Sequence, residues 1–324
     1  MNSMNHFVRN QLNTSTAGYC IYPPVIKSGA LYGSSYTEYG YMSPGNVYLP
    51  RNGVTLYTSQ RGRGQNIWVA SRTGAIGQIE HILRHSENPA QLVNTPEQRT
   101  GALPLALAAS HDHPGVVELL LDRGADINQL DPRGQKTALM WASFLGYTEV
   151  VGILLKRGAN VNAQNNEGKT ALMFASLQGH VGVVGLLLGA GANVNAQNNE
   201  GDTALTAASL QGHVGVVELL IRKGAKNVRN KRGNTALHLA ALNGRENVVR
   251  YLLQIGAPVN LENNEGNTAL SAAALKGYYS IVKLLLEAKA DRSLRNKGKE
   301  TARDIARRNN RWEIVDLLDN YWPN

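Results

Sequence analysis

Few groups of residues in this sequence could do chemistry together. The only cluster with metal-ligand chemistry is His111, Asp112 and His113, which supplies two imidazoles and a carboxylate. Three side chains in one turn rarely all point at a single ion, and Pro114 follows directly. We therefore interpret the cluster as a loop and predict no metal site.

A second candidate is Gly168-Lys169-Thr170, which matches the end of a phosphate-binding loop. That loop needs another glycine five residues before Gly168, and Ala163 stands there instead. The single cysteine, Cys20, lies away from any histidine partner, and the sequence has no Gly-x-Ser-x-Gly motif and no conspicuous pair of carboxylates. The sequence therefore predicts no catalytic residue and no cofactor, and we expect the protein not to be an enzyme.

The composition is that of a globular protein, with 324 residues, 43% hydrophobic and 18% charged. No apolar run reaches the roughly 18 residues of a membrane-spanning helix. The first residues lack a basic-then-apolar secretion signal, and a lone cysteine suits a reducing compartment. We expect an intracellular, cytoplasmic protein, with the nucleus or export into a host cell as open alternatives. The net charge of +9 points only weakly to acidic partners.

A repeat dominates the sequence. A Thr-Ala-Leu triplet recurs at steps of roughly 33 residues, beginning at Thr137, Thr170, Thr203, Thr235 and Thr268. Residues 158–190 and 191–223 match at about 26 of 33 positions, which indicates tandem duplication of one structural unit.

One unit shows what each repeat should form. Asn165 to Gly168 has the composition of a turn, and Thr170 is placed to cap a helix that Gly179 ends. The small residues Ala171, Ala175 and Ser176 should permit close approach of the next unit. A second helix follows, with its buried stripe formed by Val183, Val184, Leu187 and Leu188.

The Gly-x-Thr-Ala-Leu, Gly-His and Leu-Leu-x-x-Gly-Ala patterns resemble the ankyrin repeat family, over about residues 65–320. The resemblance implies an all-α solenoid of about eight helix-turn-helix units with short loop fingers, and the first and last units as caps. We place the repeat domain at 64–324, with units near 64–97, 98–130, 131–164, 165–197, 198–229, 230–262, 263–295 and 296–324. Residues 1–63, which hold eight of the thirteen tyrosines, are predicted to be a disordered tail.

The resemblance also assigns structural roles to three histidines. His180 and His213 occupy the Gly-His position of the family, where the imidazole bonds to nearby backbone. His238 occupies the Thr-x-x-His position and should bond across repeats.

Binding residues in the family cluster at loop tips and on the first helix of each unit, along the concave side. Carried over to this sequence, the first-helix positions are Phe144, Leu145, Leu177, Gln178, Leu210, Gln211, Leu242, Asn243, Leu275 and Lys276, and the loop-tip positions include Arg133, Glu167 and Glu200. Five successive units thus place a large apolar residue at one equivalent point. Two alternatives stay open: an exposed strip that docks a partner, or side chains that seal neighbouring helices.

Two groups of basic residues stand out. The first crowds one finger that is about one residue shorter than its neighbours, and it consists of Arg222, Lys223, Lys226, Arg229, Lys231 and Arg232. The second lies near the C-terminus and consists of Arg292, Arg295, Lys297, Lys299, Arg303, Arg307 and Arg308. Each could meet an acidic or phosphorylated partner, or could be a solvated edge, which a terminal unit needs in any case. The absence of interleaved aromatic residues argues against nucleic acid.

We therefore predict a monomeric, non-catalytic scaffold or adaptor that binds a protein partner on its concave groove and loop tips. One alternative is an enzyme-associated or secreted effector whose tail carries the activity. Another is a peripheral protein that binds anionic membranes, or another acidic partner, through its basic loops.

Overall fold

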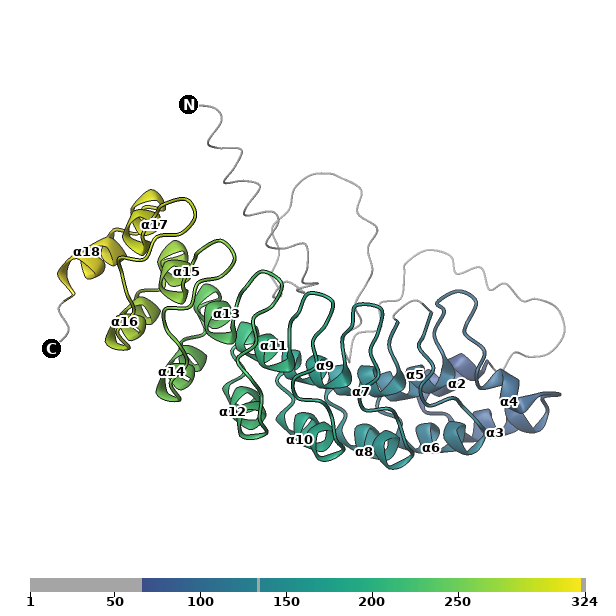
Figure 1. The fold of residues 1–324 in the computed structure, drawn as a ribbon. Helices are drawn as coiled ribbons and strands as arrows, with labels where there is room; N and C mark the ends of the chain where they lie inside the picture. The colour runs from purple at the N-terminus through teal and green to yellow at the C-terminus, as the bar shows by residue number, and fades with distance from the viewer. Residues whose placement is uncertain (1–65, 133–134, 322–324) are drawn as a thin grey trace, which may run out of the picture. The chain divides into compact units, whose positions relative to one another are not determined.

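A computed structural model of the chain describes residues 66–132 and 135–321. Within these residues the regular secondary structure is helical throughout and no strand occurs. The helices alternate between two rows that run along the stack (Figure 1). The predicted tail, residues 1–63, lies outside the described residues.

The first row holds the first helix of each unit: α2 (Ile67–Thr73), α5 (Pro104–Ser110), α7 (Ala138–Leu145), α9 (Ala171–Gln178), α11 (Ala204–Gln211), α13 (Ala236–Leu242), α15 (Ala269–Lys276) and α17 (Ala302–Arg308). The second row holds α3 (Ile76–Arg84), α6 (Pro114–Asp122), α8 (Thr148–Lys156), α10 (Val181–Gly189), α12 (Val214–Arg222), α14 (Glu246–Gln254), α16 (Tyr279–Glu287) and α18 (Trp312–Asn320). A short helix, α4 (Pro89–Leu92), lies in the longer connection between α3 and α5. The eight pairs confirm the predicted all-α solenoid of eight units.

The helix boundaries follow from the capping residues that the sequence supplies. Thr170 accepts a hydrogen bond at Oγ1 from the backbone N–H of Met173 at 3.3 Å, which caps α9. Gly179 ends the same helix with φ +80°, a conformation that a side chain disfavours. Before the helix, Asn165 Oδ1 accepts backbone N–H bonds from Glu167 at 3.1 Å and Lys169 at 2.8 Å. The predicted turn, cap and stop of this unit are therefore confirmed.

The core runs through the stack as one apolar cluster, from Ile67 in the first unit to Leu318 in the last. In the unit of α9 and α10, Val183, Val184 and Leu187 are fully buried, as predicted, whereas Leu188 is only partly buried. Small residues on the first helices lie between neighbouring units without solvent contact. Since each pair of helices covers its neighbour, no unit has a core of its own.

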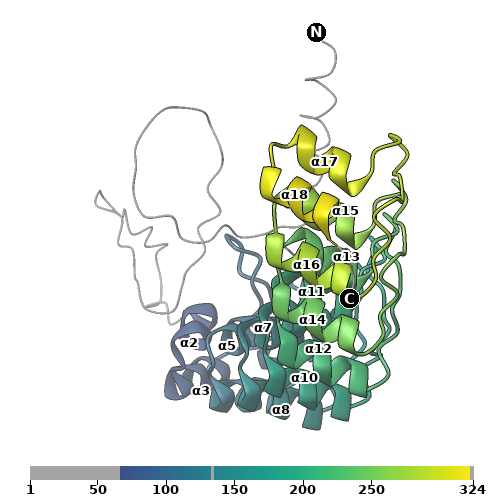
Figure 2. The same cartoon turned by 90° about the vertical axis from the view of Figure 1, so that its left-hand side faces the viewer.

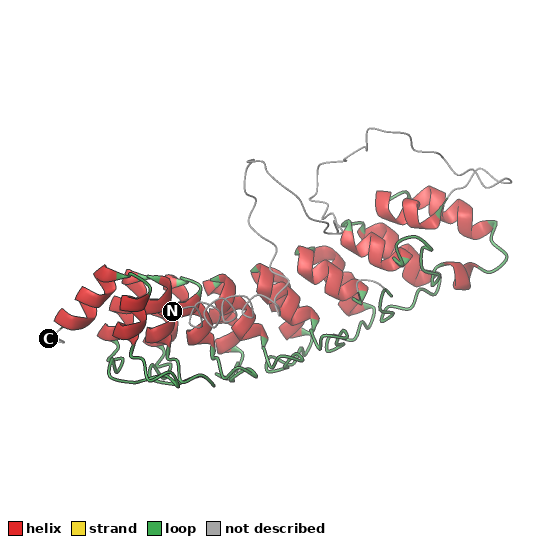
Figure 3. Ribbon diagram, turned by 90° about the horizontal axis from the view of Figure 1, so that it is seen from above, coloured by secondary structure: helices red, strands yellow, loops and turns green. Residues whose placement is uncertain are grey.

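Long loops project along one side of the two rows and form the fingers (Figure 3). Figure 2, which looks along the stack with the C-terminal units nearest the viewer, shows the fingers one behind another. They are joined by backbone hydrogen bonds, among them Asn199 N–H to Glu167 O at 2.9 Å and Asn264 N–H to Arg232 O at 3.0 Å. Backbone hydrogen bonds therefore join each finger to the next from residue 165 to residue 300.

Candidate functional site

The predicted apolar row lies at the C-terminal ends of successive first helices. Phe144, Leu145, Leu177, Leu242 and Leu275 are half-buried, while Leu210 is only 5% exposed. Of the polar residues beside them, Gln178 and Lys276 are exposed, and Gln211 and Asn243 are half-buried. The sequence left two alternatives open, an exposed strip or side chains that seal neighbouring helices, and the row combines them. Its members are partly covered within the stack, and all but Leu210 keep accessible surface.

An aromatic cluster at α7 and α9 extends this row, and the sequence analysis did not single it out. Phe144 meets Phe174 edge to face, with 6.1 Å between ring centroids. The indole N–H of Trp141 donates to Asp131 Oδ2 at 2.7 Å, and Lys136 Nζ lies 4.4 Å from the centroid of the Trp141 ring. A signal was available, since the position of Trp141 is occupied in other units by smaller apolar residues. The cluster is the most aromatic part of the first-helix row.

The predicted fingertip residues lie apart from the first-helix row, on the projecting loops. Glu167 is exposed and forms an ion pair with Lys169 at 2.5 Å. Glu200 is also exposed, and its carbonyl oxygen accepts the backbone N–H of Lys231 at 2.9 Å. Arg133 lies outside the described residues. The fingertips present side chains of both charges over a backbone that hydrogen bonds hold in place.

The basic finger keeps all of its cationic side chains at the surface: Arg222, Lys223, Lys226, Arg229, Lys231 and Arg232 are exposed. Arg229 is partly engaged, because its Nε–H donates to Gly233 O at 3.2 Å and its Nη2 donates to Glu262 O. The segment from Leu219 to Arg245 contains no Asp or Glu. The structure therefore brings six cations together on one finger and the adjoining end of α12.

A series of hydrogen bonds to asparagine side chains, which joins most neighbouring units, is interrupted at the joint after the basic finger. At most joints an asparagine Oδ1 accepts a backbone N–H of the next unit, as in Asn195 to Lys226 and Asn260 to Asp291, both at 2.8 Å. At the joint after the basic finger, Pro258 stands where the donor should be, and proline has no N–H. Among the described residues, no such hydrogen bond crosses this joint.

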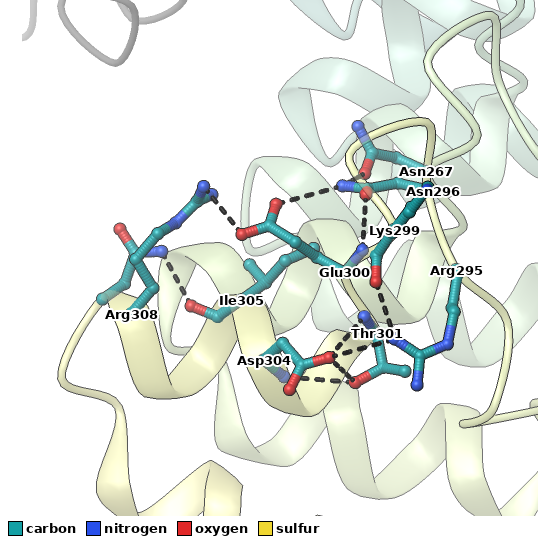
Figure 4. A network of polar contacts seen from close by, with 10 residues as sticks. Asn267, Arg295, Asn296, Lys299, Glu300, Thr301, Asp304, Ile305 and Arg308 are labelled. Atoms are coloured by element: carbon teal, nitrogen blue, oxygen red, sulfur yellow. Dashed lines mark hydrogen bonds and ion pairs between the residues drawn. The ribbon is translucent and has the colours of Figure 1, made fainter. Parts of the chain in front are cut away.

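Most side chains of the C-terminal basic group form hydrogen bonds or ion pairs within the protein (Figure 4). Arg308 pairs with Glu300 at 2.8 Å, and Arg295 lies 3.8 Å from Asp304. Arg303 holds Asp319 with two hydrogen bonds, which lower the pKa of that carboxyl below its usual value. Lys297, Lys299 and Arg307 stay exposed. Most of this group therefore ties the last unit together.

Some of these side chains, with Arg292, Ser293, Thr301 and Leu318, line a cavity of about 400 Å³. Hydrogen bonds from the backbone and hydroxyl of Thr301 lower the pKa of Asp304. The pKa of both carboxyl groups that line the cavity therefore lies below its usual value. A general acid would need the opposite shift.

Three histidines form hydrogen bonds between neighbouring units. The Nε2–H of His180 donates to Phe144 O at 3.0 Å, and that of His213 to Leu177 O at 3.1 Å. His238 Nε2 reaches Asn267 O at 3.1 Å in the next unit. The predicted roles of these three residues are confirmed. The bonds of the first two join each second helix to the first helix of the preceding unit.

The two histidines of the candidate metal cluster also bond to backbone carbonyls, His111 within its own unit and His113 to the preceding unit. His111 Nδ1 bonds to Leu107 O at 2.9 Å, and His113 Nε2 bonds to Arg72 O at 2.8 Å. Across residues 66–132 and 135–321, no three His, Cys, Asp or Glu side chains are grouped as metal ligands. In the same ranges, no helix combines the length and the apolar character that a membrane crossing requires.

Comparison with known proteins agrees with this architecture. The family described as ankyrin repeats (3 copies) matches overlapping stretches at residues 67–165, 105–198, 172–263, 226–296 and 255–321. The ankyrin repeat domain of human ASB11, known from its crystal structure, superposes with a TM-score of 0.62 at 26% sequence identity. That likeness covers 69% of this chain and the whole of the ASB11 domain.

Curated relatives share only part of their length with this chain. Mouse ankyrin repeat and SAM domain-containing protein 6 is 37% identical over 119 residues, which are 37% of this chain and 13% of that protein. Human neurogenic locus notch homolog protein 1 is 42% identical over 66 residues, which are 20% of this chain and 2% of that protein. The shared segments are therefore small parts of those longer proteins.

Proposed function

Because the chain belongs to the ankyrin repeat family, whose repeats are protein–protein interaction modules, we propose that it is a non-catalytic scaffold that holds a protein partner on its first helices and fingertips. The observation that carries the proposal is the apolar row at the same point of successive first helices, in which every member except Leu210 is half-buried. We further propose that the protein acts as a monomer inside the cell.

The aromatic cluster is the strongest candidate for the anchor of such a contact. Large aromatic side chains at well-packed positions contribute much of the energy of protein interfaces. Trp141 and Phe144 meet this description, since each is half-buried and held by a defined neighbour. Their fixed rotamers would lower the entropy cost of binding. We therefore place the centre of the interface at α7 and α9, with Leu177 beside it.

Site-specific crosslinking tests the proposal and identifies the partner in one experiment. A photo-reactive amino acid is placed at Gln178, which is exposed beside the apolar row, or at Gln211, which holds the equivalent place in the next unit. The matched control carries it at Arg250, which is exposed on α14 in the second row. The proposal expects one protein to be captured from both first-helix positions and not from the control.

Alanine substitution then tests the anchor. Phe144→Ala and Leu177→Ala should weaken the captured complex at least tenfold, the loss typical of a truncated anchor. Leu186→Ala is the control, because Leu186 is 38% exposed but belongs to α10 in the second row. Equal affinities of all three variants, with unchanged helical circular dichroism, would reject the first-helix surface.

The basic finger favours a second candidate function, the binding of an acidic or phosphorylated partner or of an anionic membrane. Six exposed cations without a carboxylate in the same segment give a local positive potential. Binding through this finger should weaken steeply with salt and fall when Lys231 and Arg232 are changed to alanine. An affinity that is independent of salt would exclude it.

An activity carried by the tail is the remaining alternative, and it rests on residues 1–63. Limited proteolysis that removes this segment separates the two possibilities. Under the scaffold proposal, both the partner capture from Gln178 and the biological activity survive the cleavage. Under the tail alternative, the biological activity is lost while the capture persists.

A further inference from the structure

Two aromatic side chains project from neighbouring units at the C-terminal end of the stack. Trp312 is 59% exposed and Tyr279 is 44% exposed. Each is the first residue of its second-row helix, α18 and α16. The other second-row helices begin with residues that are not aromatic: Ile76, Pro114, Thr148, Val181, Val214 and Glu246. The paired exposed rings are thus a property of the last two units.

Cations flank the two rings. Lys276 is the last residue of α15 and Arg311 precedes Trp312, and both side chains are exposed. In the equivalent place two units earlier, Arg245 is fixed by its Nε–H bond to Leu210 O at 2.9 Å. Within residues 135–321, the side chains of Lys276 and Arg311 have no hydrogen bond or ion pair. They are therefore available to an anionic partner.

Little negative charge opposes these cations. The first turn of α16 contains no acidic residue, and that of α18 contains only Glu313. Neither helix has a side-chain cap, although the backbone N–H of Tyr279 donates to Gly277 O at 3.1 Å and that of Ile314 donates to Arg311 O at 3.0 Å. Helix N-termini of this kind favour phosphate groups.

We propose that this C-terminal edge, formed by Lys276, Tyr279, Arg311 and Trp312, docks on the surface of an anionic phospholipid membrane. Trp and Tyr are the residues that sit at the headgroup level of a bilayer, because their rings are apolar with one polar atom. Lysine and arginine beside them attract anionic headgroups. Both rings stand out from the surface, which suits insertion between lipids.

The proposal goes beyond the scaffold function and does not depend on it. The C-terminal edge belongs to α15–α18, whereas the anchor proposed for a protein partner belongs to α7 and α9. One molecule could therefore hold a partner and a membrane together.

Vesicle co-sedimentation of the full chain tests the proposal. The probes are vesicles of phosphatidylcholine alone and vesicles with about 30% phosphatidylserine. The edge variants are Trp312→Ala with Tyr279→Ala, and Lys276→Glu with Arg311→Glu. Ile76→Ala is the matched control, because Ile76 is 43% exposed at the same helix position in the first unit. Lys231→Ala with Arg232→Ala tests the basic finger.

We expect sedimentation that requires phosphatidylserine. Loss of the rings should weaken it about tenfold, as removal of roughly 60 Å² of inserted apolar surface implies. Neutralising one cation corresponds to about fivefold, so a double charge reversal should abolish binding. The Ile76 variant should bind as the unaltered chain does, and the finger variant should weaken binding less than either edge variant. All variants should keep the same melting temperature, since the changed side chains are exposed.

Three results would overturn the proposal. The first is no sedimentation of the unaltered chain with phosphatidylserine vesicles. The second is binding that survives both edge variants, or that is lost in the finger variant alone. The third is an equal change of Trp fluorescence on adding poly-glutamate without lipid, abolished by Trp312→Ala, which would assign the edge to an acidic polypeptide instead.

Discussion

A pair of glycines separates two causes of instability that sequence alone cannot distinguish. Gly179 and Gly191 both have positive φ, +80° and +85°. A Cβ at Gly179 would lie 2.6 Å from Nδ1 of His213, which belongs to the next unit. A Cβ at Gly191 would have no atom within 4 Å. Alanine at either position is strained, but only Gly179→Ala also collides with the neighbouring repeat.

The magnitudes follow from these contacts. The left-handed conformation costs alanine roughly 1–2 kcal/mol at both positions. Displacing His213 would add about 1–3 kcal/mol of overpacking and about 1 kcal/mol for its hydrogen bond to Leu177 O. Gly179→Ala should therefore destabilise the stack by about 2–4 kcal/mol more than Gly191→Ala.

Urea unfolding followed by circular dichroism measures the difference. A double variant, Gly179→Ala with His213→Ala, serves as the control for the collision. Because the ring is then absent, the two changes should be less harmful together than the sum of their separate effects. Equal midpoints for Gly179→Ala and Gly191→Ala, or simple additivity in the double variant, would refute the reasoning.

Three further predictions concern the core, the histidines and the last finger. The Oγ atoms of three buried serines, Ser143, Ser176 and Ser209, have no hydrogen-bond partner, and alanine stands at the same place in later units, at Ala241 and Ala274. Ser176→Ala should therefore raise the free energy of unfolding by about 1 kcal/mol. A lowered urea midpoint would contradict this. Burial lowers the pKa of His238 and of His213, so the unfolded chain binds protons that the folded chain does not. The free energy of unfolding should therefore fall as the pH drops below about 6.5, and His238→Ser, which matches Ser271 in the next unit, should lessen that fall in urea titrations at pH 7.5 and 5.5. Lys299 has φ +61°, so Lys299→Gly should raise the free energy of unfolding by up to about 1 kcal/mol and raise the melting temperature slightly. Gly266→Ala should lower the melting temperature, because its Cβ would lie 3.0 Å from Asn296 Cα.

The fold could be predicted because its causes are local and repeated. A threonine cap, a glycine stop and a two-helix apolar pattern recur at a constant spacing. A unit whose own pattern is weak can therefore be assigned from the units on either side of it. The structural histidines could be predicted for the same reason. Pairs such as Arg303 and Asp319 could not, because 16 residues separate them and only the packing of α17 on α18 brings them together.

The exposure of the apolar row could not be predicted either, because it depends on the unit that follows. Leu177 and Leu210 have the same sequence neighbours, yet one is half-buried and the other buried. His213 lies at the end of α9 beside Leu177, whereas the longer Arg245 lies at the end of α11. Its Nη2 extends to Gln211 Oε1 at 3.4 Å. A local pattern fixes which residues share a face, and a neighbouring side chain decides how much of each is accessible.

The finger glycines show how the last unit differs from the others for a physical reason. At Gly168, Gly201, Gly233 and Gly266 a Cβ would come within 2.6–3.1 Å of a backbone nitrogen in the following finger. Lys299 occupies the same place in the last finger with φ +61°. No finger follows it in the described residues, so a side chain meets no neighbour there, and only the backbone strain remains. At these four glycines the next finger therefore adds a steric requirement to that of the turn. Gln135, with φ +49° two residues before the cap Thr137, shows that the turn by itself accepts a side chain at this place.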